Sequence, residues 1–298
     1  MPRTEVNGVQ LHYHAQGSGT PIVFLHPACI GSRVFTYLHN DLSRDFRTIR
    51  FDFRGHGQSG TAPAKVTIPL LVEDTCRLMD ALDVPNAYLI SYSVASMVAL
   101  EALLTHPNRF RGAALMSGMA EAEGWRTRTK LKMGGFAGRV GARDFLVFPQ
   151  LWSNSDNIYT YRRLRGETLH GDIGKWREYM ESAMAYSAVS RLPYIDQPVL
   201  LLCGERDAES LRHARTLQQG LRNDSTAFLP GRKHTLPTYG GDEAGALIRG
   251  WLYALEGREP EAEGLSEDQA ADPPLADAGR YMPDPDFPAD TDLPSARR

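Results

Sequence analysis

The sequence has few cysteines and no long apolar run. Its three cysteines, Cys29, Cys76 and Cys203, are far apart and odd in number, which is not the pattern of a disulfide framework. No apolar run approaches the roughly 18 residues of a membrane-spanning helix. The first residues, MPRTEVNGVQ, lack the apolar core of a signal peptide. We therefore expect a cytoplasmic protein that does not bind a membrane.

Charge of one sign is also scarce, except near the C-terminal end. The net charge is −3, so nothing in the overall balance indicates a nucleic-acid partner. Residues 257–298, however, carry a net charge of −7 and seven of the 19 prolines, with few large apolar side chains. Such a segment buries too little surface to offset the entropy lost on ordering, so it predicts a disordered acidic tail.

The rest of the chain alternates between strand-like and helix-like segments. A hairpin with Asn7 and Gly8 in its turn comes first. A short, continuous apolar run at 20–27 then predicts a strand buried on both faces. Further strands are expected at 46–55, 86–91, 111–118, 197–204 and 225–231. Helical spacing of apolar residues follows at 68–82, 94–106, 209–221 and 242–255. This alternation predicts an α/β fold with a mostly parallel central sheet flanked by helices.

One segment interrupts this alternation. Residues 119–193 contain no strand-like run and much helix-like sequence, and they are rich in aromatic residues. The sequence therefore predicts a core formed by residues 1–118 and 194–256, and a helical cap, 119–193, inserted before the last two strands. Open α/β sheets bind ligands at the carboxyl ends of their strands, so we expect the cap to cover that edge.

The stretch ISYSVAS, residues 90–96, contains three serines and lacks glycine. A nucleophilic serine on a strand-to-helix turn needs small residues two positions before and two after it. Ser91 fails this test because Leu89 precedes it, and Ser96 fails because Val94 and Val98 flank it. Ser93, with Ser91 and Ala95 on either side, passes, so we predict that Ser93 is the nucleophile.

A serine nucleophile needs a histidine base and a carboxylate that orients it, and in this kind of fold they follow in the order Ser, Asp, His. Asp207 follows one predicted strand and His234 follows the last one. Glu205, Glu121 and Glu123 are weaker candidates for the acid, and His213, in mid-helix, is expected to face solvent. The N–H groups of Ala28 and Val94 are the predicted oxyanion donors, since Pro27 has no N–H.

Three segments together resemble the α/β-hydrolase fold family: FLHPACIGS, FDFRGHGQSG and LISYSVASMVALEALLTHPNRFRGAALM. Within it, the chain is most similar to enol-lactonases, small esterases and cofactor-free haloperoxidase-like proteins. It departs from the family pattern at Pro27, which replaces a glycine, and at Ser91 and Ala95, which replace the two glycines of the turn. The resemblance implies a serine hydrolase that needs no cofactor or metal.

The function predicted from these residues is hydrolysis of a carboxylic ester or lactone. A carbon–carbon bond hydrolase, a thioesterase or an acyltransferase could use the same residues. A ligand-binding protein with a vestigial triad and an interaction protein whose acidic tail recruits a basic partner are alternatives from other classes. The substrate is expected to be a small molecule, apolar or aromatic, in a pocket bordered by His26, Cys29, Tyr92, Trp125 and Trp152.

Overall fold

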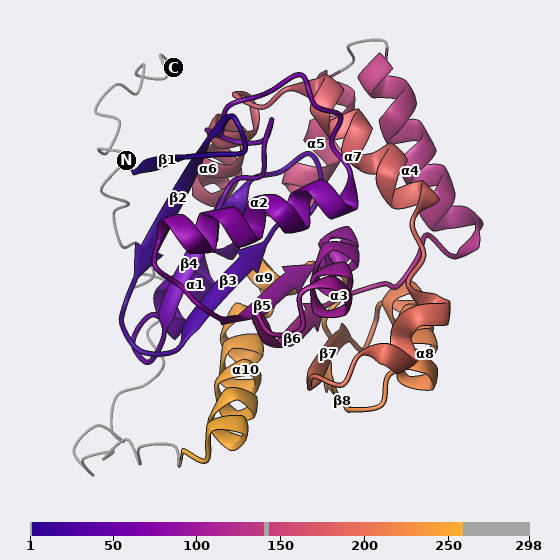
Figure 1. The fold of residues 1–298 in the computed structure, drawn as a ribbon. Helices are drawn as coiled ribbons and strands as arrows, with labels where there is room; N and C mark the ends of the chain where they lie inside the picture. Colours follow the sequence, from indigo (N-terminus) through magenta and orange to yellow (C-terminus); the bar gives the residue numbers. More distant parts are fainter. Residues whose placement is uncertain (1, 140–142, 259–298) are drawn as a thin grey trace, which may run out of the picture.

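A computed structural model describes residues 2–139 and 143–258 of the chain. Its centre is an eight-stranded sheet with the order β1-β2-β4-β3-β5-β6-β7-β8 (Figure 1). The strands are β1 Arg3–Val6, β2 Val9–Gln16, β3 Pro21–Leu25, β4 Arg47–Phe51, β5 Ala87–Tyr92, β6 Phe110–Met116, β7 Val199–Gly204 and β8 Asp224–Leu229. Only β1 and β2 pair antiparallel with their neighbours. The predicted mostly parallel sheet is therefore confirmed.

The strand sequences explain this order. Every residue of β5 and of β7 is buried, as expected for central strands covered by helices on both faces. The edge strand β8 is mostly half-buried or exposed. Between β1 and β2, Asn7 and Gly8 both have positive φ, 48° and 70°, as a two-residue hairpin turn requires.

Helices cover both faces of the sheet. The helices α2 and α3 pack against each other on the face that is nearer in Figure 1, and α1 packs against α10 on the opposite face. Their bounds are α1 Thr36–Leu42, α2 Ile68–Ala81, α3 Ser96–Thr105, α8 Ala208–Gly220, α9 Leu236–Tyr239 and α10 Gly241–Glu256. Short 3₁₀ turns are η1 Ser32–Phe35, η2 Ser93–Ala95 and η3 Val189–Tyr194.

Four helices come between β6 and β7, and we call them the inserted helices: α4 Gly124–Arg139, α5 Arg143–Ser153, α6 Ile158–Thr168 and α7 Ile173–Ala185. They lie together on one side of the sheet (Figure 1). The two connections to them run side by side, with a bridge between Glu121 and Ser187. These helices occupy most of the segment predicted as a cap.

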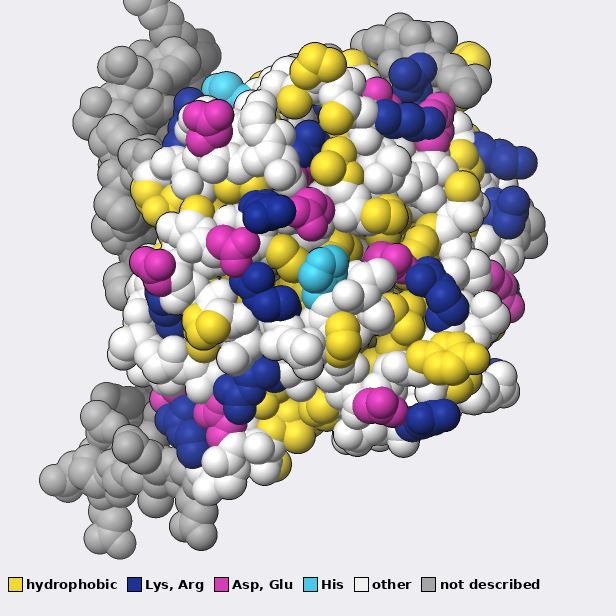
Figure 2. All heavy atoms as spheres, viewed as in Figure 1, with side chains coloured by type: hydrophobic (Ala, Val, Ile, Leu, Met, Phe, Trp, Pro, Cys, Tyr) yellow, Lys and Arg dark blue, Asp and Glu magenta, His cyan; other side chains and the backbone are white. Residues whose placement is uncertain are grey.

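The surface on the α2 and α3 side mixes basic, acidic and apolar side chains (Figure 2). No helix within the described ranges is long and apolar enough to cross a membrane. The helix α10 ends at Gly257, whose φ of 62° is the left-handed conformation common after a helix. The predicted disordered tail is 257–298, and all of it except Gly257 and Arg258 lies outside the described residues.

Candidate active site

Ser93 lies at the sharp turn where β5 gives way to α3. Its φ is +56°, a conformation that costs energy for any residue other than glycine. The Ser96 hydroxyl lies 2.7 Å from the Ser93 carbonyl oxygen and accepts the Met119 N–H at 2.7 Å. These contacts join the strained turn to the segment that follows β6. They hold Ser93 between the end of β5 and the start of α3.

The residues that replace the usual glycines are tightly enclosed. Ser91 and Ala95 are both fully buried, which agrees with the requirement for small side chains on which the prediction of Ser93 depends. The Ser91 hydroxyl has no hydrogen-bond partner among the described residues. A buried hydroxyl without a partner destabilises the folded state, because it has lost its hydrogen bonds to water.

We therefore expect Ser91→Ala to raise the free energy of unfolding by about 1 kcal/mol. The matched variant Ser96→Ala removes a hydroxyl that is bonded, and it is expected to lower the same quantity by about 1–2 kcal/mol. Urea denaturation of both variants checks this pair. Destabilisation by Ser91→Ala of the same size as by Ser96→Ala would mean that Ser91 has a partner after all.

The three residues predicted from chain order meet at the carboxyl edge of the sheet. His234 lies in the loop between β8 and α9, with Nε2 2.9 Å from Ser93 Oγ. Its Nδ1 is 2.8 Å from Oδ2 of Asp207, which follows β7. The Ser117 hydroxyl donates to the carbonyl oxygen of His234 at 2.9 Å and so fixes the histidine loop from β6. We call Ser93, His234 and Asp207 the candidate triad.

The electrostatics of the candidate triad favour an ionised acid. Burial raises the pKa of Asp207, but hydrogen bonds from His234 and Ser210 outweigh it and lower that pKa to about 2. The side chain of His234 is 40% exposed and that of Asp207 only 11%. The histidine is therefore open to a molecule from solvent, while the carboxylate behind it is shielded.

The turn after β3 carries Ala28, one of the two predicted oxyanion donors. Cys29 adopts a φ of 72°, so the backbone reverses directly after Ala28. His26 is fully buried, and its ring bridges two backbone groups: Nε2 accepts the Phe53 N–H at 2.8 Å and Nδ1 donates to the Pro27 carbonyl at 2.9 Å. His26 thus supports the turn from within and has no ring nitrogen left for a substrate.

Cys29 is buried as well. Burial raises the pKa of its thiol to about 12, so the thiol stays protonated at neutral pH and is a poor nucleophile.

The predicted second donor, Val94, belongs to the first turn of η2, where backbone N–H groups lack partners within the helix. Ala28 and Val94 remain the predicted oxyanion donors.

Two carboxylates accept backbone N–H groups from the residues that follow Cys29 in the turn after β3. Asp52 accepts the Ser32 N–H at 2.8 Å, and Glu167 of α6 accepts the Arg33 N–H at 3.2 Å. Burial raises the pKa of Asp52, but its hydrogen bond and ionic contact with His12 reverse this and keep the pKa well below its ordinary value. The turn is therefore attached both to the sheet and to the inserted helices.

The end of α5 and the residues directly after it contact the segments around the candidate triad. Gln150 Nε2 donates to the Ala28 carbonyl at 3.1 Å, and the Tyr92 hydroxyl donates to Asn154 Oδ1 at 3.0 Å. The Tyr239 hydroxyl, from α9, donates to the Ser155 carbonyl at 2.5 Å. The short segment 150–155 thus contacts the turn after β3, the strand end before Ser93 and the helix after His234.

The aromatic residues predicted to border the pocket differ in their burial and position. Tyr92 is buried, with its ring centroid 5.5 Å from that of His234. Trp152 is 63% exposed and stacks on Phe148, on the side of α5 away from Gln150 and Asn154. The side chain of Trp125 lies outside the described residues.

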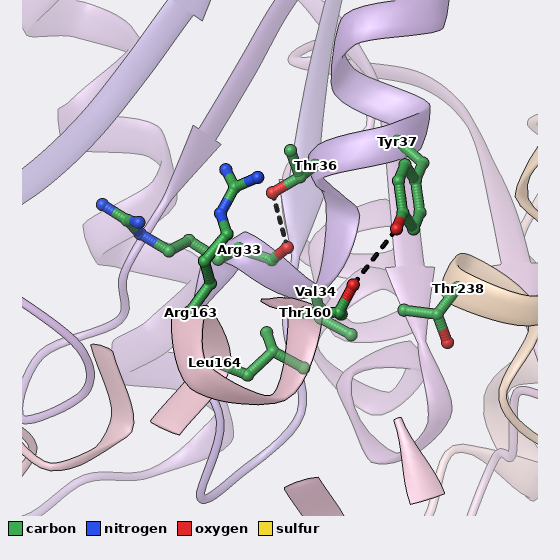
Figure 3. A pocket seen from close by; sticks show the side chains of 8 residues that line it. All are labelled: Arg33, Val34, Thr36, Tyr37, Thr160, Arg163, Leu164 and Thr238. Carbon is green, nitrogen blue, oxygen red and sulfur yellow. Dashed lines mark hydrogen bonds between the residues drawn. The ribbon is translucent and has the colours of Figure 1, made fainter. Parts of the chain in front are cut away.

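Figure 3 shows a small cavity that no residue of the candidate triad lines. It has a volume of about 20 Å³, and its lining comes from η1, α1, α6 and α9. The guanidinium groups of Arg33 and Arg163 point in different directions, and the Tyr37 hydroxyl meets Thr160 Oγ1 at 3.1 Å. This volume suits a water molecule better than a substrate.

Within the described parts of the chain, no group of three or more metal-ligating side chains could hold a metal ion.

Some residues near the site were not predicted. Ser210, Gln150 and Asn154 contact the candidate triad or the turns around it. Only Ser210 had a usable signal in the sequence, its position three residues after Asp207 at a helix start.

The expectation for His213 was wrong: it is 2% exposed, with Thr127 Oγ1 of α4 lying 3.4 Å from its Nε2. The inserted helix α4 covers a helix face that the sequence alone leaves open to solvent.

Known proteins resemble this chain over most of its length. A putative carbamate hydrolase, RutD, of Azorhizobium caulinodans is 25% identical over 266 residues, which cover 86% of this chain and all of that protein. The enol-lactonase from Burkholderia xenovorans matches with a TM-score of 0.75 and 22% identity over 84% of this chain and 99% of its own. A thermophilic esterase from Thermogutta terrifontis matches with a TM-score of 0.74 and 19% identity over 86% of this chain and 99% of its own.

The structural matches agree with the overall fold described above. A family model, described as the alpha/beta hydrolase fold, matches residues 20–213, which include β3 with the turn after it, Ser93 and Asp207. That match spans well over half of the chain, and the chain therefore belongs to the α/β-hydrolase fold family.

Proposed function

We propose that the protein is a serine hydrolase that cleaves a carboxylic ester or lactone through Ser93, His234 and Asp207. The observation that carries this proposal is the unbroken hydrogen-bonded relay from Ser93 Oγ to His234 Nε2 at 2.9 Å and from His234 Nδ1 to Asp207 Oδ2 at 2.8 Å. A serine hydroxyl is a weak nucleophile, and such a relay is the arrangement that activates it.

The ionised carboxylate sets the tautomer of the base. Asp207 Oδ2 accepts a proton-bearing Nδ1, which leaves the Nε2 lone pair directed at the Ser93 hydroxyl. Because hydrogen bonds lower the pKa of Asp207 to about 2, its negative charge is present at neutral pH and stabilises the imidazolium that forms during the reaction.

In the first step, His234 Nε2 takes the proton of Ser93 as Oγ bonds to the carbonyl carbon. The electron pair of the carbonyl moves to its oxygen, and the N–H groups of Ala28 and Val94 stabilise that oxyanion. A single donor of this kind contributes about 10²–10³ in rate. The tetrahedral intermediate then collapses, the carbon–oxygen bond to the alcohol breaks, and His234 returns the proton to the leaving oxygen.

In the second step, water attacks the acyl-enzyme. His234 takes a proton from the water, the oxyanion forms again at the same donors, and the bond to Ser93 Oγ breaks as Oγ regains its proton. The products are a carboxylic acid and free enzyme, or one hydroxy acid if the substrate is a lactone. Every proton transfer uses His234, so the sequence of steps needs no metal or organic cofactor.

The exposure of the site and the names of the relatives support this proposal. The His234 side chain is 40% exposed, and Ser93 is partly exposed, so a small substrate can reach both. The similar proteins are named as an esterase, an enol-lactonase and a putative carbamate hydrolase. Esters, lactones and carbamates are all attacked at a carbonyl carbon.

Labelling with a fluorophosphonate probe tests the proposal. We expect the folded protein to form an adduct on Ser93, mapped by mass spectrometry, because the probe reports an activated serine. Ser93→Ala and His234→Ala are expected to remove the adduct. The matched variant His106→Ala changes a half-buried histidine directly after α3, and it is expected to retain the adduct.

Absence of labelling in the folded wild-type protein would contradict the proposal and favour a ligand-binding protein with a vestigial triad. Labelling at Ser91 would overturn the choice of nucleophile. If Ser93 is labelled, turnover of a short-chain ester, a lactone, a carbamate and a thioester, each compared with the Ser93→Ala variant, ranks the substrate classes.

A further inference from the structure

Ser210, near the start of α8, lies against the Asp207–His234 pair. It is 1% exposed, and its hydroxyl donates to Asp207 Oδ2. The same carboxylate oxygen is 2.8 Å from His234 Nδ1, and Ser210 Oγ is itself 3.3 Å from that nitrogen. Ser210 therefore contacts both the acid and the base of the candidate triad, although it does not touch Ser93 in these contacts.

The other oxygen of the carboxylate is also bonded to Ser210. Its backbone N–H donates to Asp207 Oδ1 at 3.2 Å, so that Asp207 caps the N-terminus of α8. One residue thus donates to both carboxylate oxygens, once from its side chain and once from its backbone. This fixes the plane of the carboxylate relative to α8 and leaves it little freedom to rotate away from His234.

We propose that Ser210 is a positioning residue of the site: it holds the Asp207 carboxylate against His234 and weakens the attraction of that carboxylate for the imidazolium. This inference depends on the proposed function, because it concerns the same relay. A hydroxyl that donates to a carboxylate draws negative charge from the oxygen that His234 shares. Without Ser210, the full charge of that oxygen would act on the imidazolium.

Few other ionisable groups face this pair. Burial raises the pKa of Tyr92, and it raises that of Cys203 to about 12, so both stay neutral in the range where histidine titrates. His213, further along α8, is also buried, and burial lowers its pKa. On the histidine loop, Lys233 is exposed and Arg232 pairs with Glu243. Ser210 is thus the neighbour whose removal alters the Asp207–His234 pair most directly.

The pH dependence of Ser93 labelling by the fluorophosphonate probe tests this inference without a known substrate. In Ser210→Ala we expect the acid limb of the labelling rate to move up by about half to one pH unit, since the carboxylate of Asp207 then attracts the imidazolium more strongly. The plateau rate is expected to fall about ten-fold, because the carboxylate is less firmly oriented.

Thr216→Val is the matched control. Thr216 is also on α8, and its hydroxyl donates to a carboxylate, Glu123, at 3.1 Å, away from the candidate triad. It is expected to leave the profile unchanged. Ser210→Thr keeps the hydroxyl and is expected to retain the wild-type midpoint, whereas Ser210→Cys, a weaker donor of similar size, is expected to shift it in the same direction as alanine.

The outcomes separate the two proposals. If the wild-type protein is not labelled at Ser93, the proposed function fails. If the wild type is labelled but Ser210→Ala or, should that variant not fold, Ser210→Cys keeps the wild-type midpoint, only the role of Ser210 is overturned. Equal shifts in the threonine and alanine variants would assign the effect to packing and would also overturn it.

Discussion

Replacing Asp207 with asparagine is expected to lower the rate of Ser93 labelling, and of ester turnover, by about 10³–10⁴-fold at neutral pH while the fold is retained. An asparagine side chain has almost the same shape, but it can present an NH₂ group to His234 Nδ1. The imidazole then bonds as an acceptor at Nδ1 and carries its proton on Nε2. In that tautomer it cannot take the proton of Ser93.

The matched control is Asp196→Asn. Asp196 is 82% exposed and pairs with Arg222 at the surface, so this variant is expected to be labelled at the wild-type rate. Labelling of Asp207→Asn within ten-fold of the wild type would show that His234 does not depend on this carboxylate. One of the other acids near the strand ends, such as Glu205, would then be the candidate.

Stability against acid gives a second readout of the same variant. The pKa of Asp207 is lowered in the folded protein, from its ordinary 3.8 to about 2, so its charge stabilises the fold above about pH 4. That contribution is lost as pH falls through this range. The wild type should therefore lose stability between about pH 4 and 2 more steeply than Asp207→Asn does, as measured by thermal unfolding.

The sequence could predict the candidate triad because each member has a signal in the local pattern. Ser93 and Asp207 follow the buried strands β5 and β7, and His234 follows the edge strand β8. Parallel strands bring their carboxyl ends to one edge. The size test then distinguished Ser93 from Ser91 and Ser96. The positive φ of Ser93 and the full burial of Ser91 agree with the physical reason for that test.

The sequence could not predict which side chains surround the triad, because that depends on how the inserted helices sit. Trp152, on α5, and Asn154, directly after its last residue, are two positions apart, and of the two only Asn154 faces the core. Helical periodicity relates the two positions to each other, but it does not say which one faces the sheet. His213 was misjudged for the same reason, since the helix that buries it comes from a distant part of the chain.

The buried ion pair between Arg54 and Asp74 gives the largest expected effect on stability. Arg54 Nε and Nη2 donate to the two oxygens of Asp74, each at 2.5 Å, and the two side chains are 1% and 0% exposed. Asn7 Nδ2 also donates to Asp74, at 3.0 Å. A single carboxylate on α2 therefore joins the loop after β4 to the turn between β1 and β2.

Asp74→Asn is expected to lower the free energy of unfolding by about 3–5 kcal/mol, as measured by urea denaturation, because it leaves the Arg54 guanidinium buried without a counter-charge. Asp196→Asn, which breaks a pair at 3.3 Å whose side chains are 62% and 82% exposed, is expected to change it by at most about 0.5 kcal/mol. The double variant Arg54→Met, Asp74→Leu is expected to be more stable than Asp74→Asn, since it removes both charges from the interior. If the double variant were as unstable as Asp74→Asn, the instability would come from lost packing and from the lost Asn7 contact rather than from an unpaired charge. Either change affects the candidate triad only indirectly, because Arg54 contacts α2 rather than Ser93. The folded fraction of each variant should therefore still be labelled at Ser93.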